Sequence, residues 1–343
     1  MWASTSRHLP AAQLISARTS MRQQDTPMAI NWYPGHMHKA RKEMLNVLPQ
    51  MDVIIEMTDA RIPASSENPV IAELKSQKPC IKLLSKSDLA DPALTEQWQQ
   101  FWLREHGVQS LAITTDEPGR IKQLPDLIRK LVPANTAQTR KIQALIVGIP
   151  NVGKSTLINY LLGRPAAKTG NEPAVTKAQQ KLHLSDDIVL NDTPGILWPK
   201  FENTNGGYRL AITGAIRDTA IDYQDIALFL AGFLASHYPQ QLQHRYQVVA
   251  PAGELDTQDE IDLLEQIGKK RGAKGAGGRV NLHKAAEVLI HDYRSGSIGN
   301  ITLETPEMIK SELVEVARLR AEREAIEKAK QEKRAKKKKG VRH

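Results

Sequence analysis

Cysteine, aromatic residues and long apolar runs are all scarce in this 343-residue sequence. Cys80 is the single cysteine, so the chain cannot form an internal disulfide, which fits a reducing compartment. No run of 18 apolar residues occurs, so we expect no transmembrane helix. Hydrophobic residues make up 41% of the chain and charged residues 25%, which predicts a soluble globular protein with room for two domains.

Acidic residues are few at both ends of the chain. Residues 328–343 contain nine Lys or Arg and one Glu, which accounts for most of the net charge of +9. Such a tail favours a polyanion or is simply a solvated end. Residues 1–27 contain three Arg and one acid, Asp25. We interpret them as a dispensable leader before an internal start at Met28, with an organelle transit peptide as the alternative.

Apolar runs alternate with helical patterns over the first 200 residues, which predicts an α/β fold with a doubly wound, mostly parallel sheet. Strands are expected within residues 51–61, 79–88, 108–115, 143–149 and 187–192. Helices are expected within residues 38–50, 68–77, 92–107, 120–132 and 154–163. From Tyr208 onward the patterns are mostly helical, within residues 214–238, 258–270, 281–296 and from about 306. They predict a smaller all-α domain after the sheet.

The stretch "GIPNVGKST" fits the phosphate-binding pattern G-x-x-x-x-G-K-[ST] and lies between an expected strand and an expected helix, as the motif requires. Its glycines let backbone N–H groups surround a β-phosphate, and the helix N-terminus adds positive charge. Lys154 would bridge the β- and γ-phosphates, and Ser155 would bind Mg²⁺. The expected phosphate-binding residues are Asn151, Val152, Gly153, Lys154, Ser155, Thr156 and, from a later turn, Gly195.

That later turn is "LNDTPG", about 40 residues downstream. Asp192 ends an apolar run, where its carboxylate could hold Mg²⁺ through water, and Gly195 could offer its N–H to a γ-phosphate. Thr176, in the intervening "EPAVTK", is a candidate to cap Mg²⁺ from a loop and is equally compatible with an ordinary loop threonine.

The stretch "SKSD" ends another expected strand. Guanine presents two donors, N1–H and N2–H, on one edge, and the carboxylate of Asp88 could accept both. The stem of Lys86 could lie across the base plane. Adenine lacks this pair of donors, so the arrangement would select guanine. By itself "SKSD" is weak evidence for a guanine site. It becomes stronger evidence because the same sequence also contains a phosphate-binding loop.

The order "SKSD", "SLAITT", "GIPNVGKST", "PAVTK", "DTPG" resembles that of the circularly permuted GTPases. The segments "NWYPGHMHKARKEM" and "MTDARIPASSENP" narrow the resemblance to the ribosome biogenesis GTPase A family. It implies a GTP-hydrolysing factor for late large-subunit assembly, in the cytoplasm or, if residues 1–27 are a transit peptide, the mitochondrial matrix. The expected parts are residues 1–27 as leader, 28–205 as permuted GTPase domain, 206–305 as helical RNA-binding domain and 306–343 as charged helix and basic tail.

The resemblance also assigns a second base loop, at Thr114 and Thr115, where the family usually has Ser-Ala. Ser85 stands where the family usually has Asn. Its hydroxyl could still tie the loops together but offers fewer donors, which predicts weaker base affinity.

No Gln follows "DTPG" to orient a water; Ile196 and Leu197 stand there instead, as in the family. The resemblance offers His36 as the catalytic residue, with loop packing or rRNA contact as the alternative. Asn151 matches the position that holds K⁺ in potassium-stimulated relatives, with an ordinary loop asparagine as the alternative. This sparse machinery predicts slow GTP hydrolysis to GDP, stimulated by a partner.

Basic residues near position 270 predict phosphate contacts to structured RNA, with a solvated linker as the alternative. They are Lys269, Lys270, Arg271, Lys274 and Arg279. We expect the partners to be a large-subunit precursor and its rRNA, and the chain to be monomeric. Two rival hypotheses stay open: a P-loop ATPase or kinase, and an RNA chaperone with a vestigial nucleotide site.

Overall fold

The computed structural model describes residues 33–69, 71, 78–133, 136, 139–167, 180–198, 201–251 and 253–340. Residues Ala29–Thr305 make one compact unit, and the C-terminal residues from Pro306 belong to another. Each unit is described by itself below.

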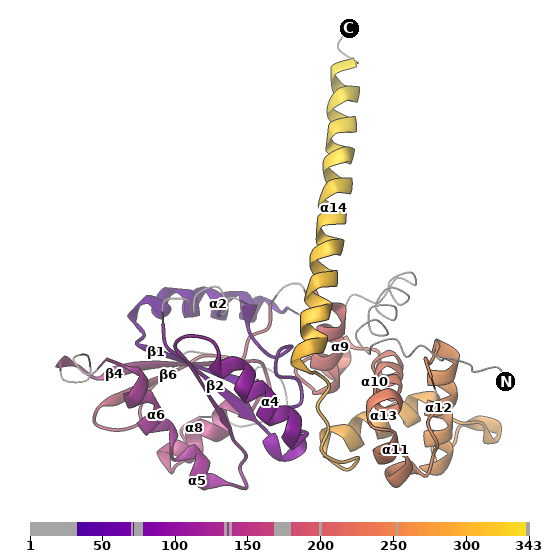
Figure 1. The fold of residues 1–343 in the computed structure, drawn as a ribbon, viewed down its shortest axis with the longest axis horizontal. Helices are drawn as coiled ribbons and strands as arrows, with labels where there is room; N and C mark the ends of the chain where they lie inside the picture. The colour runs from indigo at the N-terminus through magenta and orange to yellow at the C-terminus, as the bar shows by residue number, and fades with distance from the viewer. Residues whose placement is uncertain are drawn as a thin grey trace, which may run out of the picture. The chain divides into compact units, whose positions relative to one another are not determined.

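A six-stranded sheet forms the first half of the larger unit (Figure 1), in the order β3-β2-β1-β4-β6-β5. Every neighbouring pair is parallel except β5 with β6. The strands are β1 Val53–Asp59, β2 Cys80–Ser85, β3 Val108–Ala112, β4 Ile142–Gly148, β5 Gln180–His183 and β6 Ile188–Asp192. This confirms the predicted doubly wound, mostly parallel α/β fold.

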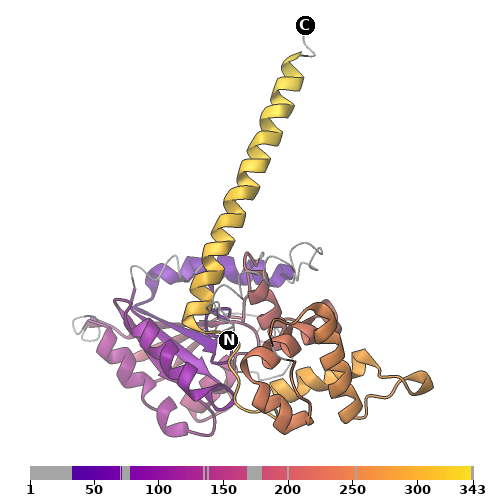
Figure 2. The ribbon, with the colours of Figure 1, turned by 45° about the vertical axis from the view of Figure 1, so that its right-hand side comes forward.

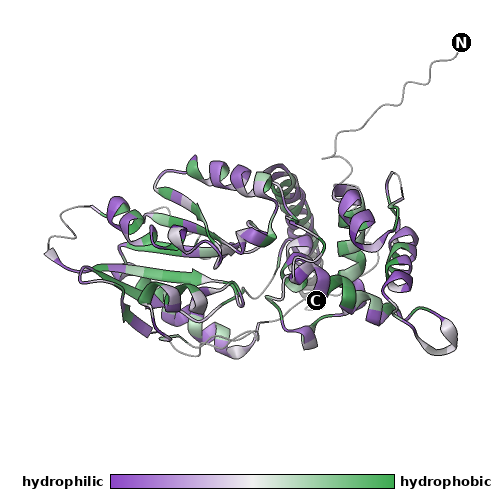
Figure 3. Ribbon diagram, turned by 90° about the horizontal axis from the view of Figure 1, so that it is seen from below, coloured by the Kyte–Doolittle hydropathy of each residue, from purple (hydrophilic) through white to green (hydrophobic). Residues whose placement is uncertain are grey.

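The central strands are buried along their length, because helices cover both faces of the sheet. Figure 3 shows them as hydrophobic ribbons between helices of mixed character. Two charges interrupt β1 and β2, and they lie opposite each other: Lys82 Nζ is 2.6 Å from Glu56 Oε2. Glu67 adds a second carboxylate 2.8 Å from the same ammonium, so the buried lysine is compensated.

Helices connect the strands of this half. Their bounds are α2 Gly35–Val47, η1 Leu48–Gln50, η3 Ser87–Leu89, α4 Pro92–Leu103, α5 Pro118–Ile121, α6 Leu124–Leu131 and α8 Lys154–Leu162. The helix expected within 120–132 is present as α6 but starts later than residue 120, because Pro125 near its start begins a new helix instead of continuing α5. Most of the helix expected within 68–77 lies outside the described residues.

The edge strand β5 was not predicted. Its sequence, QKLH, carries one apolar residue, and three of its four side chains are exposed, so no apolar run marks it. It is recognised only through its antiparallel pairing with β6.

The second half of this unit is helical, with bounds α9 Thr204–Ile212, η4 Asp218–Ala220, α10 Tyr223–His237, α11 Pro239–Tyr246, α12 Thr257–Lys270, η5 Ala276–Gly278 and α13 Leu282–Arg294. The helix expected within 214–238 starts later, since the Asp222 side chain accepts the N–H groups of Gln224 and Asp225 and caps α10 there. We call residues 269–279, at the end of α12 and before α13, the basic loop. It projects away from the helices (Figure 2), and its Lys274 forms a bridge with Val280.

The separate C-terminal element, α14 Pro306–Gly340, is one long helix that starts where a helix was expected and continues through basic residues that were expected to form a tail. Pairs one turn apart support it: Arg318 lies against Glu315 and Glu322, and Arg320 lies against Glu324. Within the described residues, no helix is both long enough and apolar enough to cross a membrane.

Candidate functional site

The predicted site loops leave the sheet at one edge. Chain order runs outward in one direction from β1 to β3 and in the other from β4 to β6, so the strand order reverses between β1 and β4. In open α/β sheets, ligands bind at such a reversal, beyond the carboxyl ends of the strands. Lys86 follows β2, the phosphate-binding loop follows β4, and Asp192 ends β6. Loops distant in sequence therefore meet there.

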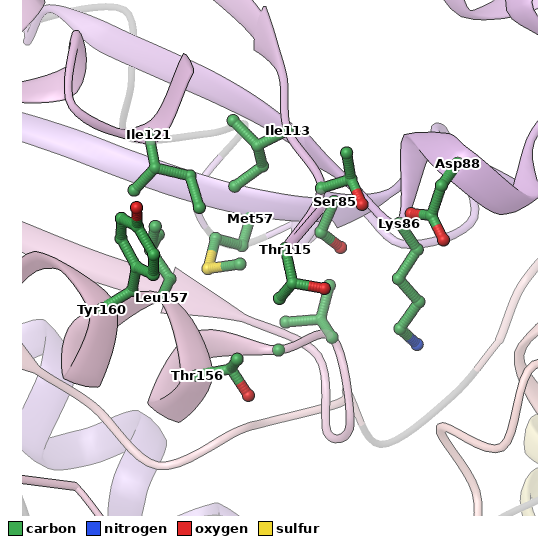
Figure 4. A pocket seen from close by; sticks show the side chains of 13 residues that line it. Met57, Ser85, Lys86, Asp88, Ile113, Thr115, Ile121, Thr156, Leu157 and Tyr160 are labelled. Carbon is green, nitrogen blue, oxygen red and sulfur yellow. The ribbon is translucent and has the colours of Figure 1, made fainter. Parts of the chain in front are cut away.

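One pocket at this edge joins the predicted base site to the phosphate-binding loop (Figure 4). Its lining is Met57, Ser85, Lys86, Asp88, Ile113, Thr114, Thr115, Ile121, Val152, Gly153, Thr156, Leu157 and Tyr160. All five residues predicted to bind guanine are present, with three from the phosphate-binding loop. Six further residues that were predicted for the nucleotide site do not line this pocket, namely His36, Asn151, Lys154, Ser155, Asp192 and Gly195.

The pocket has an apolar part that sequence reasoning missed. In Figure 4, Lys86 and Asp88 lie at one end of the lining, and Ile121, Leu157 and Tyr160 lie at the other. Leu157 and Tyr160 share a face of α8 with Thr156, at helical spacing. Because Leu157 and Tyr160 follow Lys154 of the motif at helical spacing, this pattern could have identified them from the sequence.

Residues 86–91, which follow β2 and which we call the base loop, are held by an ion cluster around the buried Asp59. Lys86 has a left-handed backbone, with φ of 55°, and its Nζ lies 3.0 Å from Oδ2 of Asp59. Asp59 is buried and also accepts two hydrogen bonds from Arg61, at 2.9 and 2.8 Å. Burial opposes ionisation, but Arg61 and Lys86 hold the pKa of Asp59 well below its ordinary value. Burial, assisted by the charge of Arg61, lowers the pKa of Lys86.

Asp59 and Arg61 were not predicted as site residues, although both lie in the quoted "MTDAR" segment. Ser85 donates its hydroxyl to the Thr58 carbonyl at 2.9 Å, so it ties β2 to β1. Asp88 is exposed at the pocket.

In the second base loop, Thr114 is buried, and its hydroxyl accepts the N–H of Asp116 at 3.3 Å. This bond stabilises the turn that brings Thr114 and Thr115 to the pocket.

The phosphate-binding loop has the backbone that its sequence predicts. Asn151 and Gly153 have positive φ, of 58° and 98°, and α8 starts directly afterwards at Lys154. Gly195 packs closely on this loop: a Cβ there would lie 2.9 Å from the Cα of Pro150. Only glycine fits that approach, which places the "DTPG" turn against the phosphate-binding loop.

Lys154 and Asp192 are both buried and interact electrostatically. Burial lowers the pKa of Lys154, although Asp192 opposes the shift. Burial likewise raises the pKa of Asp192 to about 6, although Lys154 opposes it. Neither carboxylate oxygen of Asp192 has a hydrogen-bond partner within the described residues.

Such a carboxylate suits Mg²⁺ or its water ligands, and Ser155 supplies a hydroxyl at the start of α8. These residues fit the ion. Thr176, the third predicted magnesium ligand, lies outside the described residues.

Asn151 and His36 lie beside the helical half of the unit. The side-chain amide of Asn151 donates to the Gly214 carbonyl at 2.9 Å. His36, in the first turn of α2, is mostly exposed. Partial burial and the charge of Arg217 lower the pKa of His36, which favours its neutral form.

Two of the five predicted RNA-binding cations are partly neutralised. Lys269 lies 3.6 Å from Glu265, and Arg271 lies 3.7 Å from Asp292. Lys270, Lys274 and Arg279 are exposed and form no ion pair with another described residue.

A family model described as 50S ribosome-binding GTPase matches residues 143–251. Over 287 residues the chain is 44% identical to ribosome biogenesis GTPase A of Priestia megaterium, covering 81% of this chain and 98% of that protein. The chain belongs to the ribosome biogenesis GTPase A family. It is therefore a guanine-nucleotide-binding GTPase with a circularly permuted domain, which decides against the ATPase, the kinase and the vestigial site.

A further relative and a solved structure are also similar to this chain. The chain is 33% identical over 303 residues to mitochondrial ribosome-associated GTPase 1 of Xenopus tropicalis, covering 80% of this chain and 94% of that one. A crystal structure of GNP-bound YlqF from T. maritima matches with a TM-score of 0.56 and 25% identity, covering 78% of this chain and 99% of that chain.

Proposed function

We propose that this GTPase is a late assembly factor for the large ribosomal subunit. It docks on the subunit precursor in the GTP state, contacts rRNA, hydrolyses GTP and leaves. Its family membership supports this role, and one structural observation carries it: Lys86 and Asp88 line the same pocket as the phosphate-binding loop. A single nucleotide can thus be read at its base and held at its phosphates.

Guanine is selected by Asp88, whose carboxylate accepts the N1–H and N2–H of the base. Thr114 and Thr115 offer backbone N–H groups to the guanine oxygen, and Ser85 braces the loop. The stem of Lys86 covers one face of the base, while its Nζ stays on Asp59. The apolar end of the pocket, at Leu157 and Tyr160, excludes water beside the nucleotide.

The phosphates are held by backbone N–H groups of residues 151–156 at the start of α8, with Lys154 at the β- and γ-phosphates. When bound, Mg²⁺ neutralises charge that develops on the β- and γ-phosphate oxygens. Ser155, Asp192 and Thr176 would hold it. Gly195, which already touches the phosphate-binding loop, offers its N–H to the γ-phosphate.

Hydrolysis is slow by itself because no Gln follows the "DTPG" turn. His36 is the proposed water-positioning residue, and its lowered pKa keeps a basic nitrogen available at pH 7. Asn151 is the proposed K⁺ ligand through its amide oxygen, while the amide nitrogen donates to Gly214. Docking on the subunit would complete this arrangement and accelerate turnover.

The rRNA contacts come from Lys270, Lys274 and Arg279, assisted by Lys269, Arg271 and the basic residues near the C-terminus. Few aromatic residues accompany these cations, so they suit phosphates of structured RNA better than stacked single-stranded bases. We propose that the protein is a monomer and acts in the cytoplasm, or in the mitochondrial matrix if residues 1–27 direct it there.

The test is co-sedimentation with large subunits in GDP and in a non-hydrolysable GTP analogue, together with GTP hydrolysis rates. Binding should be tighter with the analogue, and subunits should accelerate hydrolysis. Equal rates with and without subunits at low salt would refute the ribosomal role.

A further inference from the structure

The segment that follows α13 lies along the loop that carries Lys86 and Asp88. We call residues 296–304 the strap. Its Asn300 side chain donates to the main-chain carbonyl of Asp88, and the N–H of Ile301 donates to the Leu89 carbonyl at 3.1 Å. At Gly296 the approach is so close that a Cβ would lie 2.8 Å from the Leu89 side chain.

Thr302 makes a second set of bonds, to Asp91 at the end of the same loop and to Ala60 after β1. Its hydroxyl accepts the N–H of Asp91 at 3.1 Å and lies 3.3 Å from the Ala60 carbonyl. The N–H of Leu303 donates to the Arg61 carbonyl at 2.8 Å. The strap therefore bonds to the base loop and also to the segment that holds Lys86 through Asp59.

The base loop needs such external support. Lys86 is a non-glycine residue in the left-handed region, a conformation that costs free energy unless the surroundings impose it. Asp88 is exposed, so packing does not fix its side chain. Its position follows from its backbone, which is held at the carbonyl by Asn300.

We propose that Asn300 and Thr302 are positioning residues for guanine recognition. The proposal rests on the proposed role of Asp88 as the reader of the base. The strap holds the main chain of residues 88–91 so that the carboxylate meets both guanine donors. The helical half of the protein thereby sets part of the guanine affinity, and binding of guanine must in turn stabilise the strap.

The experiment compares GDP with inosine diphosphate, which lacks the 2-amino group, by titration calorimetry on the full chain. Asn300→Ala and Thr302→Val should each weaken GDP binding about three- to tenfold, the usual effect of one hydrogen bond. Inosine diphosphate makes one bond fewer to Asp88, so its affinity should fall less and the preference for GDP should shrink.

Two matched variants control for folding. Ser297→Ala removes a strap hydroxyl that bonds to Ser295, not to the base loop, and should keep the native preference. Thr302→Ser keeps the hydroxyl and should restore the preference that Thr302→Val loses.

The positioning role would be overturned if Asn300→Ala and Thr302→Val left the preference for GDP over inosine diphosphate unchanged. That result could come from equal losses for both nucleotides or from no loss at all. The variant Asp88→Asn separates the two proposals. If it leaves the preference for GDP intact, the proposed base site fails; if it abolishes the preference while the strap variants do not alter it, only the strap proposal fails.

Discussion

Asp88 and Gly153 line one pocket, although the first follows β2 and the second follows β4. In this chain the base loop precedes the phosphate-binding loop. Their closeness in the fold explains why the permuted order still forms one nucleotide site. Both loops leave parallel strands at their carboxyl ends, and those ends stay adjacent wherever the chain is cut.

Exchanging Asp88 for Asn should shift nucleotide preference from GTP to xanthosine triphosphate. The amide donates where the carboxylate accepted, and xanthine has an oxygen where guanine has its 2-amino group. GTP affinity should fall about 10- to 100-fold, as for the loss of charged hydrogen bonds, when measured by calorimetry with both nucleotides. Asp116→Asn removes the same charge outside the pocket lining and should leave the preference unchanged.

Exchanging Lys154 for Met should weaken GTP binding at least about tenfold, because a charged hydrogen-bond donor to the phosphates is lost. Stability without nucleotide should not fall, since burial already disfavours the lysine charge. Calorimetry and thermal unfolding check both results. Lys181→Met, on the exposed edge strand β5, serves as the control. Unchanged GTP affinity in Lys154→Met would contradict the assigned role.

Asp192 should destabilise the protein in the absence of nucleotide and Mg²⁺. Its pKa is raised to about 6 from 3.8, so the folded state binds the proton more tightly than the unfolded chain. The stabilisation from this group is complete below pH 3.8 and is lost as pH rises through 6. Above pH 6, the free energy of unfolding of Asp192→Asn should therefore exceed that of the native protein by about 1–3 kcal/mol. This gain should shrink toward pH 4.

Denaturant titration at several pH values checks the stability effect of Asp192→Asn. The same variant should also bind Mg²⁺-GTP more weakly. Asp187→Asn should act in the opposite direction. Hydrogen bonds from Arg129 hold the pKa of Asp187 below its ordinary value, so the charged form supports folding and its removal lowers stability. A loss of stability in Asp192→Asn at pH 8 would contradict the conclusion that burial, more than Lys154, sets the pKa of this carboxylate.

Neutralising the basic loop should reduce the salt dependence of rRNA binding. In the triple variant Lys270→Gln, Lys274→Gln and Arg279→Gln, the negative slope of log affinity against log salt should become shallower by about 2–3, at roughly 0.7–0.9 per phosphate contact. Filter binding to large-subunit rRNA at several salt concentrations gives the slope. A matched triple variant in the sheet half, Arg104→Gln, Lys122→Gln and Lys130→Gln, should retain it.

The strands and the phosphate-binding loop could be predicted because their signals are local. The mostly apolar run Val53–Asp59 predicts a buried strand from its own residues, and the left-handed Gly153 follows from the motif. Strand β5 could not be predicted, since it exists by pairing with β6 and not by its own propensity. Helix α9 was missed for a similar reason: it contains two adjacent glycines that disfavour an isolated helix, yet all seven residues from Gly206 to Ile212 are buried by tertiary packing.

By itself, the sequence determined the order of the motifs and the parallel sheet, and it predicts the roles of Asp88 and Lys154, because these inferences need only residue type and spacing. Only the tertiary structure decided which distant residues hold the site loops in position. Asp59 reaches Lys86, Asn300 reaches Asp88, and Gly195 meets Pro150 through contacts between residues far apart along the chain. No local pattern encodes such contacts, since each depends on where the folded backbone brings two distant segments together.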